Sequence, residues 1–169
     1  LVSSIPTELT QLSQFCVWAY RQRGDKFSKM PFNPHTGRAA ITTDSTTLSS
    51  FNDCLNTLSR TQKYNGIGFV FQDKDGLTGI DIDHCIVNRQ FTPAAKEILA
   101  RFKQTYCEIS PSGEGLRIFC YGTFARCGKN TGKDKWLEVY NHTSPRYLTV
   151  TGNRLKSCGK KIVNCQESL

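Results

Sequence analysis

Two aspartates separated by one isoleucine carry the strongest chemical signal in the sequence. They stand in the segment Gly79-Ile80-Asp81-Ile82-Asp83, in which apolar and acidic residues alternate. On a β-strand, such alternation sends both isoleucines to the core and both carboxylates to the opposite face. Adjacent carboxylates repel each other, and a bound Mg²⁺ or Mn²⁺ ion relieves that repulsion. Substrate phosphates can supply the remaining ligands of the ion. The segment therefore predicts a divalent-metal site, and the alternative is a strand face with two solvated acids.

A glycine-containing turn at residues 110–117, with the sequence SPSGEGLR, is the second chemical feature. Gly113 and Gly115 permit a close backbone approach and exposed N–H groups. Ser112 offers a hydroxyl, and the guanidinium of Arg117 can bind two phosphate oxygens at once. The turn therefore indicates a phosphate-binding site, with an ordinary hairpin turn as the alternative.

A third carboxylate comes from residues 135–140, with the sequence KWLEVY. On a strand, Leu137 and Val139 point to one face and Glu138 points to the other. Two acids on one strand, a phosphate-binding turn and a later acid are the parts that two-metal phosphoryl transfer requires. The combination is much more specific than any one of its members.

These motifs resemble those of the archaeo-eukaryotic primase superfamily, in particular the primase-polymerase domains of phage, plasmid and integrated-element replication proteins. The similarity runs from about Phe15 to Leu155, and the order and spacing match the three motifs of the family. It is carried by residues 79–85, 109–119, 137–140 and 146–152, with 29–34 and 64–70 as leader segments. The resemblance implies an α+β fold, with an RRM-like, mostly antiparallel catalytic sheet packed on an N-terminal α/β module.

The resemblance also implies a template-directed DNA primase and polymerase, which transfers nucleotides from NTP or dNTP to a 3′-hydroxyl. Asp81, Asp83 and Glu138 would be its catalytic acids and the ligands of a two-metal Mg²⁺ or Mn²⁺ site. Ser112 and Arg117 would contact the triphosphate, although the family commonly has histidine where this chain has arginine, which predicts an altered pH dependence. The implied partners are a single-stranded DNA template and primer, nucleoside triphosphates, and a helicase domain elsewhere in the full-length protein.

The pattern of apolar residues and turn formers predicts the elements that carry these motifs. Helices are expected at residues 47–61 and 92–104, and a short one near residue 6. Strands are expected at residues 16–20, 26–32, 67–72, 77–84, 106–110, 116–121, 136–140 and 147–151, the third and fourth forming a hairpin. We expect an N-terminal module of residues 1–64, a catalytic sheet of residues 65–155, and a basic tail, poor in core residues, of residues 156–169.

Positive charge is in excess, since 22 lysines and arginines stand against 14 aspartates and glutamates and give a formal net charge of +8. Such a surplus attracts nucleic acid, although it also solubilises a protein surface. We assign Arg146 to nucleotide binding and the following residues to DNA binding: Lys29, Arg126, Lys129, Lys133 and Lys135. The sequence has neither an apolar run that could cross a bilayer nor a secretory signal, so we expect a cytoplasmic protein without a membrane partner.

Eight cysteines are scattered along the chain without a Cys-x-x-Cys pair. The spacing of Cys120 and Cys127 recurs in Cys158 and Cys165, so a four-thiolate zinc site is one interpretation. Scattered reduced thiols are the favoured one. His84 directly follows the aspartates, but alternation places it on the opposite face, as a packing or strand-end residue.

Two other functions compete with the polymerase. A replication-initiator nickase could use Tyr147 to attack DNA, but the sequence lacks the paired-histidine motif that such enzymes need. A catalytically inactive single-stranded DNA-binding module of a replication initiator agrees equally well with the charge and the fold. The three acids favour the enzyme. Nucleotide incorporation, a covalent DNA adduct, or binding alone would distinguish the three functions.

Overall fold

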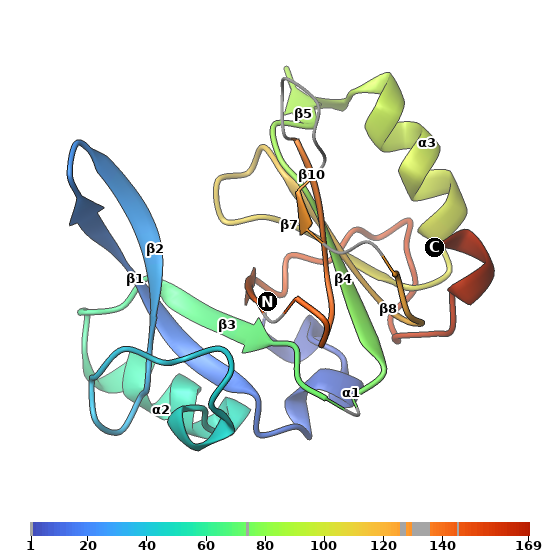
Figure 1. The fold of residues 1–169 in the computed structure, drawn as a ribbon. Coiled ribbons are helices and arrows are strands. Elements are labelled where there is room, and N and C mark those ends of the chain that lie inside the picture. Colours follow the sequence, from blue (N-terminus) through green and yellow to red (C-terminus); the bar gives the residue numbers. More distant parts are fainter. Residues whose placement is uncertain (1, 74, 126–127, 130–135, 145) are drawn as a thin grey trace.

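The computed structural model describes residues 2–73, 75–125, 128–129, 136–144 and 146–169. The chain is α+β, with few helices and mostly antiparallel sheets, as the sequence predicts (Figure 1). Its α-helices are α1 (Thr7–Thr10), α2 (Phe51–Arg60) and α3 (Pro93–Phe102). Its strands are β1 (Phe15–Arg23), β2 (Lys26–Phe32), β3 (Gly66–Val70), β4 (Leu77–Ile82), β5 (Ile86–Val87), β6 (Gln90–Phe91), β7 (Tyr106–Ile109), β8 (Leu116–Tyr121), β9 (Gly128–Lys129), β10 (Leu137–Tyr140) and β11 (Tyr147–Val150).

Two antiparallel sheets form the body of the protein. The first has the strand order β11-β3-β1-β2, and the second has the order β7-β8-β4-β10-β9. The first sheet takes β3 and β11 from beyond residue 64, so its strands come from both the predicted N-terminal module and the predicted catalytic segment. Figure 1 shows α2 beside the first sheet and α3 beside the second.

One apolar core lies between the second sheet and α3, and another is shared by the two sheets. On the second sheet, Ile80, Ile82 and Val139 pack with Phe102 and Ala95 of α3. This cluster confirms the predicted alternation, because the isoleucines beside Asp81 are 4% and 0% exposed and face the helix. Thr92 caps α3 by accepting a hydrogen bond from the Ala95 amide at 3.3 Å, and Pro93 follows at the first turn, as expected.

Aromatic rings join the two sheets. Phe69 and Phe71, at and beyond the end of β3, contact Phe119 of β8 with ring centroids 6.5 and 6.2 Å apart. Gly79 of β4 lies against this junction, where an added Cβ atom would stand 2.3 Å from Phe71 Cζ and 2.7 Å from Leu148 Cδ1. The absence of a side chain at Gly79 therefore lets the acid-bearing strand approach the first sheet closely.

Several predicted boundaries are wrong. Residues 73–76 connect β3 and β4, but these strands belong to different sheets, so they do not form the expected hairpin. Strand β4 ends at Ile82, two residues before the predicted end, because His84 adopts a positive φ of 51°. The short β5–β6 hairpin was not predicted. No helix within the described residues is long and apolar enough to span a membrane.

The C-terminal segment is packed against the second sheet. Cys158, Ile162 and Cys165 are 7%, 4% and 3% exposed, so the expectation that residues 156–169 are poor in core residues is wrong. Parallel bridges pair Gly159 with Tyr106 and Asn164 with Tyr121. Backbone pairing, which sequence periodicity does not reveal, therefore holds this basic segment to β7 and β8.

Candidate active site

A row of four charged residues crosses the second sheet. Arg117 of β8 lies directly opposite Glu108 of β7 on one side and Asp81 of β4 on the other. Asp81 in turn lies opposite Glu138 of β10. Residues opposite each other in antiparallel strands share a face, so the four side chains form one line, in the order Glu108, Arg117, Asp81 and Glu138. The exposed fractions of the four residues do not exceed 8%.

Asp81 is the centre of this row. Its Oδ1 atom lies 3.2 Å from Nε of Arg117, and the two form a buried ion pair. Burial raises the pKa of Asp81, the guanidinium of Arg117 opposes the rise, and the negative charges of Asp83 and Glu138 add to it. Because three carboxyl groups share one arginine in a place poorly reached by water, a cation would stabilise their ionised forms.

Arg117 connects this row to the first sheet. Its Nη1 donates hydrogen bonds to the carbonyl oxygen, at 2.9 Å, and to the hydroxyl of Thr149 on β11. The residue is 3% exposed. Arg117 therefore links Asp81 to β11. The predicted contact between Arg117 and triphosphate would have to be made by a guanidinium that is buried and already hydrogen-bonded.

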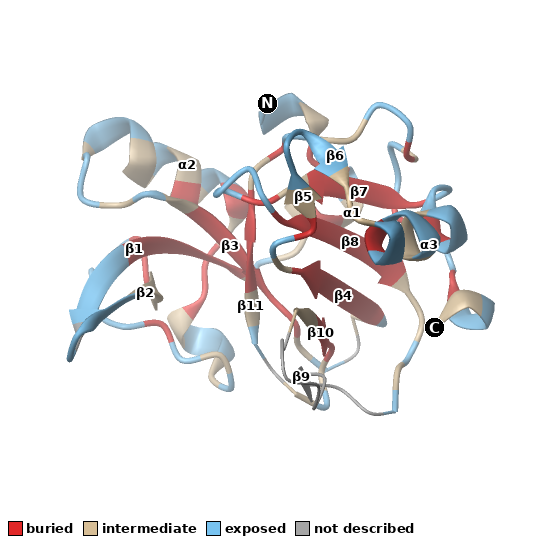
Figure 2. Cartoon of the chain, turned by 90° about the horizontal axis from the view of Figure 1, so that it is seen from above, coloured by how far each residue is buried: buried red, intermediate tan, exposed pale blue. Residues whose placement is uncertain are grey.

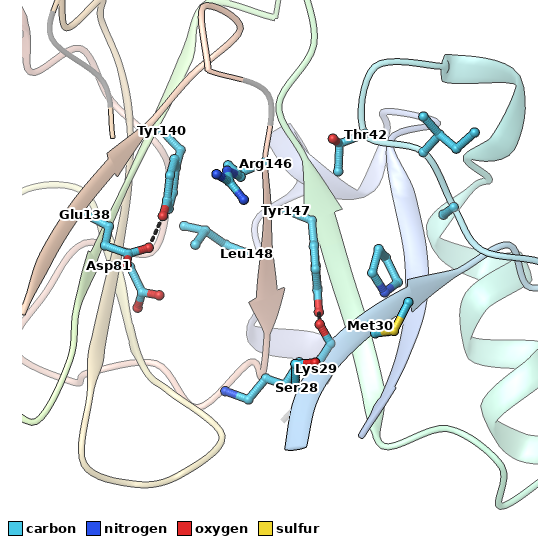
Figure 3. Close-up of a pocket in the computed structure, with 13 residues that line it drawn as sticks. Ser28, Lys29, Met30, Thr42, Asp81, Glu138, Tyr140, Arg146, Tyr147 and Leu148 are labelled. Carbon is cyan, nitrogen blue, oxygen red and sulfur yellow. Dashed lines mark hydrogen bonds between the residues drawn. The ribbon is translucent and has the colours of Figure 1, made fainter. Parts of the chain in front are cut away.

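Glu138 faces Asp81 from the neighbouring strand. Its Oε2 atom accepts a hydrogen bond from the hydroxyl of Tyr140, two residues along β10. Alternation along β10 places Glu138 and Tyr140 on the same face, while Val139 points into the core beside α3. Figure 3 shows the carboxylates of Glu138 and Asp81 next to each other.

A cleft of about 730 Å³ opens beside these two carboxylates, between the second sheet and the strands β2 and β11. Its lining consists of Ser28, Lys29, Met30, Pro31, Ala40, Ile41, Thr42, Asp81, Glu138, Tyr140, Arg146, Tyr147 and Leu148. The lining thus includes both acids of facing strands and two of the predicted cations. The volume lies in the range of sites for small organic ligands and cofactors.

Two predicted contact residues, Lys29 and Arg146, lie with Tyr147 on the wall opposite the acids. The ammonium group of Lys29 reaches toward the acidic wall in Figure 3, and burial with the charge of Arg117 lowers its pKa, while Asp81 and Asp83 oppose that change. Tyr147 donates a hydrogen bond at 2.6 Å to the Lys29 carbonyl oxygen, and Arg146 is exposed at the cleft. Residues 40–42, which also line the cleft, had no signal in the sequence.

Asp83 does not share the strand of Asp81. It follows the end of β4, is partly exposed, and lines a separate hollow with Thr92 and Trp136. The expectation that one strand carries both aspartates is therefore wrong at its C-terminal end, although Asp83 remains close enough for its charge to raise the pKa of Asp81. Within the described part of the chain, no group of three or more His, Cys, Asp or Glu side chains is arranged to hold a metal ion.

The glycine-containing turn lies beside the end of β4. The Gly113 amide donates to the Ser110 carbonyl oxygen at 3.0 Å, and the Gly115 amide donates to Ser110 Oγ at 3.0 Å. Both N–H groups are used within the turn, so the expectation that they are exposed for phosphate is wrong. Ser112 is exposed, with its hydroxyl 3.0 Å from that of Ser110, and remains accessible to a ligand.

The remaining predicted residues have varied outcomes. The side chain of His84 is 84% exposed with Nδ1 3.7 Å from Glu114, so His84 ends the strand and does not pack. Lys129 lies on β9, opposite Glu138 in register. Arg126, Cys127, Lys133 and Lys135 lie outside the described residues, so the proposed DNA contacts and the four-thiolate site are not tested there. The other seven cysteines are free and buried.

Glu108 is the residue of this row that the sequence reading missed. It is 0% exposed and accepts hydrogen bonds from the Tyr106 hydroxyl and from the amides of Thr151 and Gly152. The available signal was a glutamate within the otherwise uncharged strand sequence YCEI. Alternation also gives Tyr106 and Glu108 the same face, as it does for Glu138 and Tyr140.

This chain matches no protein-family profile. It is 32% identical over 157 residues to a protein of Nitratiruptor phage NrS-1 that is named DNA primase-polymerase. The aligned stretch covers 90% of this chain and 21% of the phage protein, so the chain spans about a fifth of the length of this relative. Over nearly its whole length, the chain is therefore related to one segment of a phage DNA primase-polymerase.

Proposed function

We propose that the cleft between the two sheets is the active site of a template-directed primase-polymerase of a phage or mobile-element replication protein. The observation that carries this proposal is the register of β4 and β10, which sets Asp81 directly opposite Glu138 at the cleft. The relationship to the phage primase-polymerase segment supports it independently. The substrates would be nucleoside triphosphates, a single-stranded DNA template and a primer.

The donor set fits Mg²⁺ or Mn²⁺. Proteins commonly bind Mg²⁺ through one or two carboxylates together with substrate phosphates, so Asp81 and Glu138 suffice as ligands in the cleft. Asp83 is near enough for its charge to raise the pKa of Asp81, and would be a third ligand. When bound, a pair of such ions would lower the pKa of the primer 3′-hydroxyl and neutralise the triphosphate charge.

The other cleft residues would bind and orient the substrates. Lys29 and Arg146 would attract triphosphate oxygens, because both are cations on the cleft wall. Arg117 would act as a positioning residue, since its ion pair fixes the Asp81 carboxylate while its bonds to Thr149 fix the guanidinium. Tyr140 would orient Glu138 through the hydrogen bond between their side chains. Ser112 would contact the triphosphate from the neighbouring turn.

Primer extension and unprimed synthesis with Mg²⁺ and with Mn²⁺ test the proposal. The protein should incorporate nucleotides as the template directs, and Asp81→Asn and Glu138→Gln should each reduce incorporation by roughly a hundredfold or more. Thermal unfolding and single-stranded DNA binding of both variants should remain close to those of the unaltered protein.

Three outcomes would contradict the proposal. Undiminished synthesis by Asp81→Asn would remove the acids from catalysis. A covalent adduct between a tyrosine and cleaved DNA would indicate a nickase. DNA binding by the unaltered protein without any nucleotide incorporation would favour an inactive DNA-binding module.

A further inference from the structure

The β1–β2 hairpin exposes aromatic side chains away from the cleft. Phe27 is 71% exposed, which is the largest value for an apolar side chain of its size in the described part of the chain, and Tyr20 is 44% exposed. The hairpin extends away from the rest of the molecule in Figure 1, and its outer part is coloured as exposed in Figure 2. Burial of apolar surface in the protein's own core therefore does not explain these two rings.

The register of the hairpin places these rings on one face with a cation. Tyr20 of β1 lies opposite Lys29 of β2, and Gln22 of β1 lies opposite Phe27 of β2. Because side chains alternate between the two faces of a strand, all four point to the same face of the hairpin. One further pair toward the core, Trp18 packs edge-on against the Tyr20 ring at 5.3 Å, and Lys29 Nζ stands 5.7 Å from the Trp18 ring centroid. Aromatic and cationic side chains thus follow one another from the tip toward the body.

This line of side chains leads into the cleft. Lys29, which shares the face of Tyr20 and Phe27, also lines the cleft together with Pro31, which lies opposite Trp18. Its ammonium group is close enough for the charges of Asp81 and Asp83 to affect its pKa. A ligand on the hairpin face would therefore continue directly to the two carboxylates.

The hairpin is also strongly basic. Residues 20–29 contain Arg21, Arg23, Lys26 and Lys29, with Asp25 as the only acid. Lys29 lies on the face of the rings, whereas the exposed Arg21 and Lys26 lie on the opposite face, where the guanidinium of Arg21 is 5.1 Å from the centroid of the Phe32 ring. A chain of negative charges would be attracted to this hairpin, whereas a purely apolar partner would have to desolvate the cations.

We propose that the β1–β2 hairpin binds single-stranded DNA, with bases stacked on Phe27 and Tyr20, a phosphate held by Lys29 on the same face, and further attraction from the charges of Arg21 and Lys26 on the opposite face. Non-specific binding of single strands combines a positively charged surface with aromatic rings, because every base presents a flat face while every linkage carries a charge. The inference rests on the proposed function for one point, that the bound strand is the template leading to the cleft. A double helix fits less well, because its paired bases are not available for stacking.

Fluorescence anisotropy with a labelled oligothymidylate, in the absence of metal and nucleotides, tests the inference. Phe27→Ala should weaken binding of the protein about tenfold, and Phe27→Trp should restore it. Val87→Ala is the matched control, because Val87 is also exposed, at 56%, but lies on β5. Lys29→Ala should lower the slope of log K against log salt concentration by about 0.7, the value for one neutralised phosphate of a single strand.

The outcome for the hairpin is separable from the outcome for the active site. Weaker binding by Phe27→Ala supports the inference even if the unaltered protein joins no nucleotides, and Asp81→Asn should bind the oligonucleotide normally. Equal binding by Phe27→Ala, Val87→Ala and the unaltered protein would overturn the inference, as would failure of the unaltered protein to bind single strands. The inference would also be overturned if the protein bound a duplex as tightly as a single strand and Phe27→Ala left that affinity unchanged. Thermal unfolding should be unchanged in Phe27→Ala, since that ring is mostly in solvent.

Discussion

Glu108 and Asp81 occupy equivalent places on the two sides of Arg117 and have different surroundings. Both lie opposite it on neighbouring strands, and burial raises the pKa of both carboxyl groups. The oxygens of Glu108 accept hydrogen bonds from Tyr106 at 2.8 Å, from the Thr151 amide at 3.0 and 3.2 Å, and from the Gly152 amide at 2.9 Å. Asp81 instead pairs with Arg117 and borders the cleft. Of the two carboxyl groups beside Arg117, one is thus satisfied by protein donors and the other is placed to receive a ligand.

A second pair of residues repeats this contrast. Tyr106 donates its hydroxyl to Glu108 on β7, and Tyr140 donates its hydroxyl to Glu138 on β10. In both cases the partners are two positions apart along one strand, but of these four residues Tyr140 and Glu138 line the cleft and Tyr106 and Glu108 do not. A tyrosine–glutamate pair is therefore not by itself a sign of catalysis, and its position relative to the cleft decides what it does.

The largest expected effect is on nucleotide incorporation. Asp81→Asn keeps an oxygen for Arg117 but removes the charge that would bind a cation, so incorporation should fall by roughly a hundredfold or more. Glu108→Gln, measured where both variants remain folded, should retain incorporation within about threefold. Steady-state primer extension at equal folded concentration compares the two. Similar losses of incorporation in both variants would remove the functional distinction between Asp81 and Glu108.

The free energy of unfolding should change more in Glu108→Gln than in Asp81→Asn, which reverses the order expected for nucleotide incorporation. Glu108→Gln replaces one carboxylate oxygen by an NH₂ group, which cannot accept the hydrogen bonds that this oxygen accepted. The free energy of unfolding should therefore fall by about 1–3 kcal/mol. Asp81→Asn should change it less in the absence of metal, because removal of a buried charge offsets part of the weakened contact with Arg117. Urea unfolding monitored by circular dichroism gives both values. A more stable Glu108→Gln protein would show that this carboxylate does not hold the fold.

Protonation of Glu108 should make the stability depend on pH. Burial raises its pKa, opposed by the Tyr106 hydroxyl, the Thr151 amide and Arg117. Between the ordinary range of glutamate and this raised pKa, the native state holds more protons than the unfolded chain, so the free energy of unfolding falls as pH rises. Glu108→Gln should show a shallower fall, by at most about 1.4 kcal/mol per pH unit. Identical slopes in urea titrations across this window would contradict the assignment.

The smallest expected effects come from the two tyrosines. Tyr106→Phe removes a donor to Glu108 and should lower the free energy of unfolding by about 1 kcal/mol without changing incorporation. Tyr140→Phe removes the donor to Glu138, so it should raise the metal concentration needed for half-maximal incorporation about tenfold, as loss of a supporting hydrogen bond often does. Thermal unfolding and a Mn²⁺ titration of primer extension measure the two effects. The opposite result, in which Tyr106→Phe raises the metal requirement and Tyr140→Phe lowers only the stability, would contradict the roles given to Glu108 and Glu138.

Local patterns in the sequence predicted much of this architecture. The bounds of β2 and β8 agree with the expected strands, and the alternation around Asp81 and Glu138 gives the faces that the structure shows. These features depend on side-chain periodicity within one strand. The register that sets Asp81 opposite Glu138 depends on residues 57 positions apart, since 138 − 81 = 57, and no local pattern specifies it.

The errors have identifiable physical causes. A turn between two strands suggested a hairpin, but packing of Phe71 against Phe119 sends β3 and β4 into different sheets. The positive φ of His84 ends β4 before Asp83, and strand propensity does not reveal that bend. Glu108 was overlooked because its partners, the amides of residues 151 and 152, lie far along the chain. Long-range hydrogen bonding therefore limits what the sequence predicts about the site.

The proposed activity requires the carboxylates of Asp81 and Glu138 to bind a divalent cation together in the cleft. Anomalous diffraction from crystals grown with Mn²⁺ and a non-hydrolysable nucleoside triphosphate tests it most directly. A manganese peak should appear within bonding distance of both carboxylates, with the triphosphate on the side of Lys29 and Arg146, and no such peak should appear in Asp81→Asn. A well-bound triphosphate whose manganese contacts neither Asp81 nor Glu138 would contradict it.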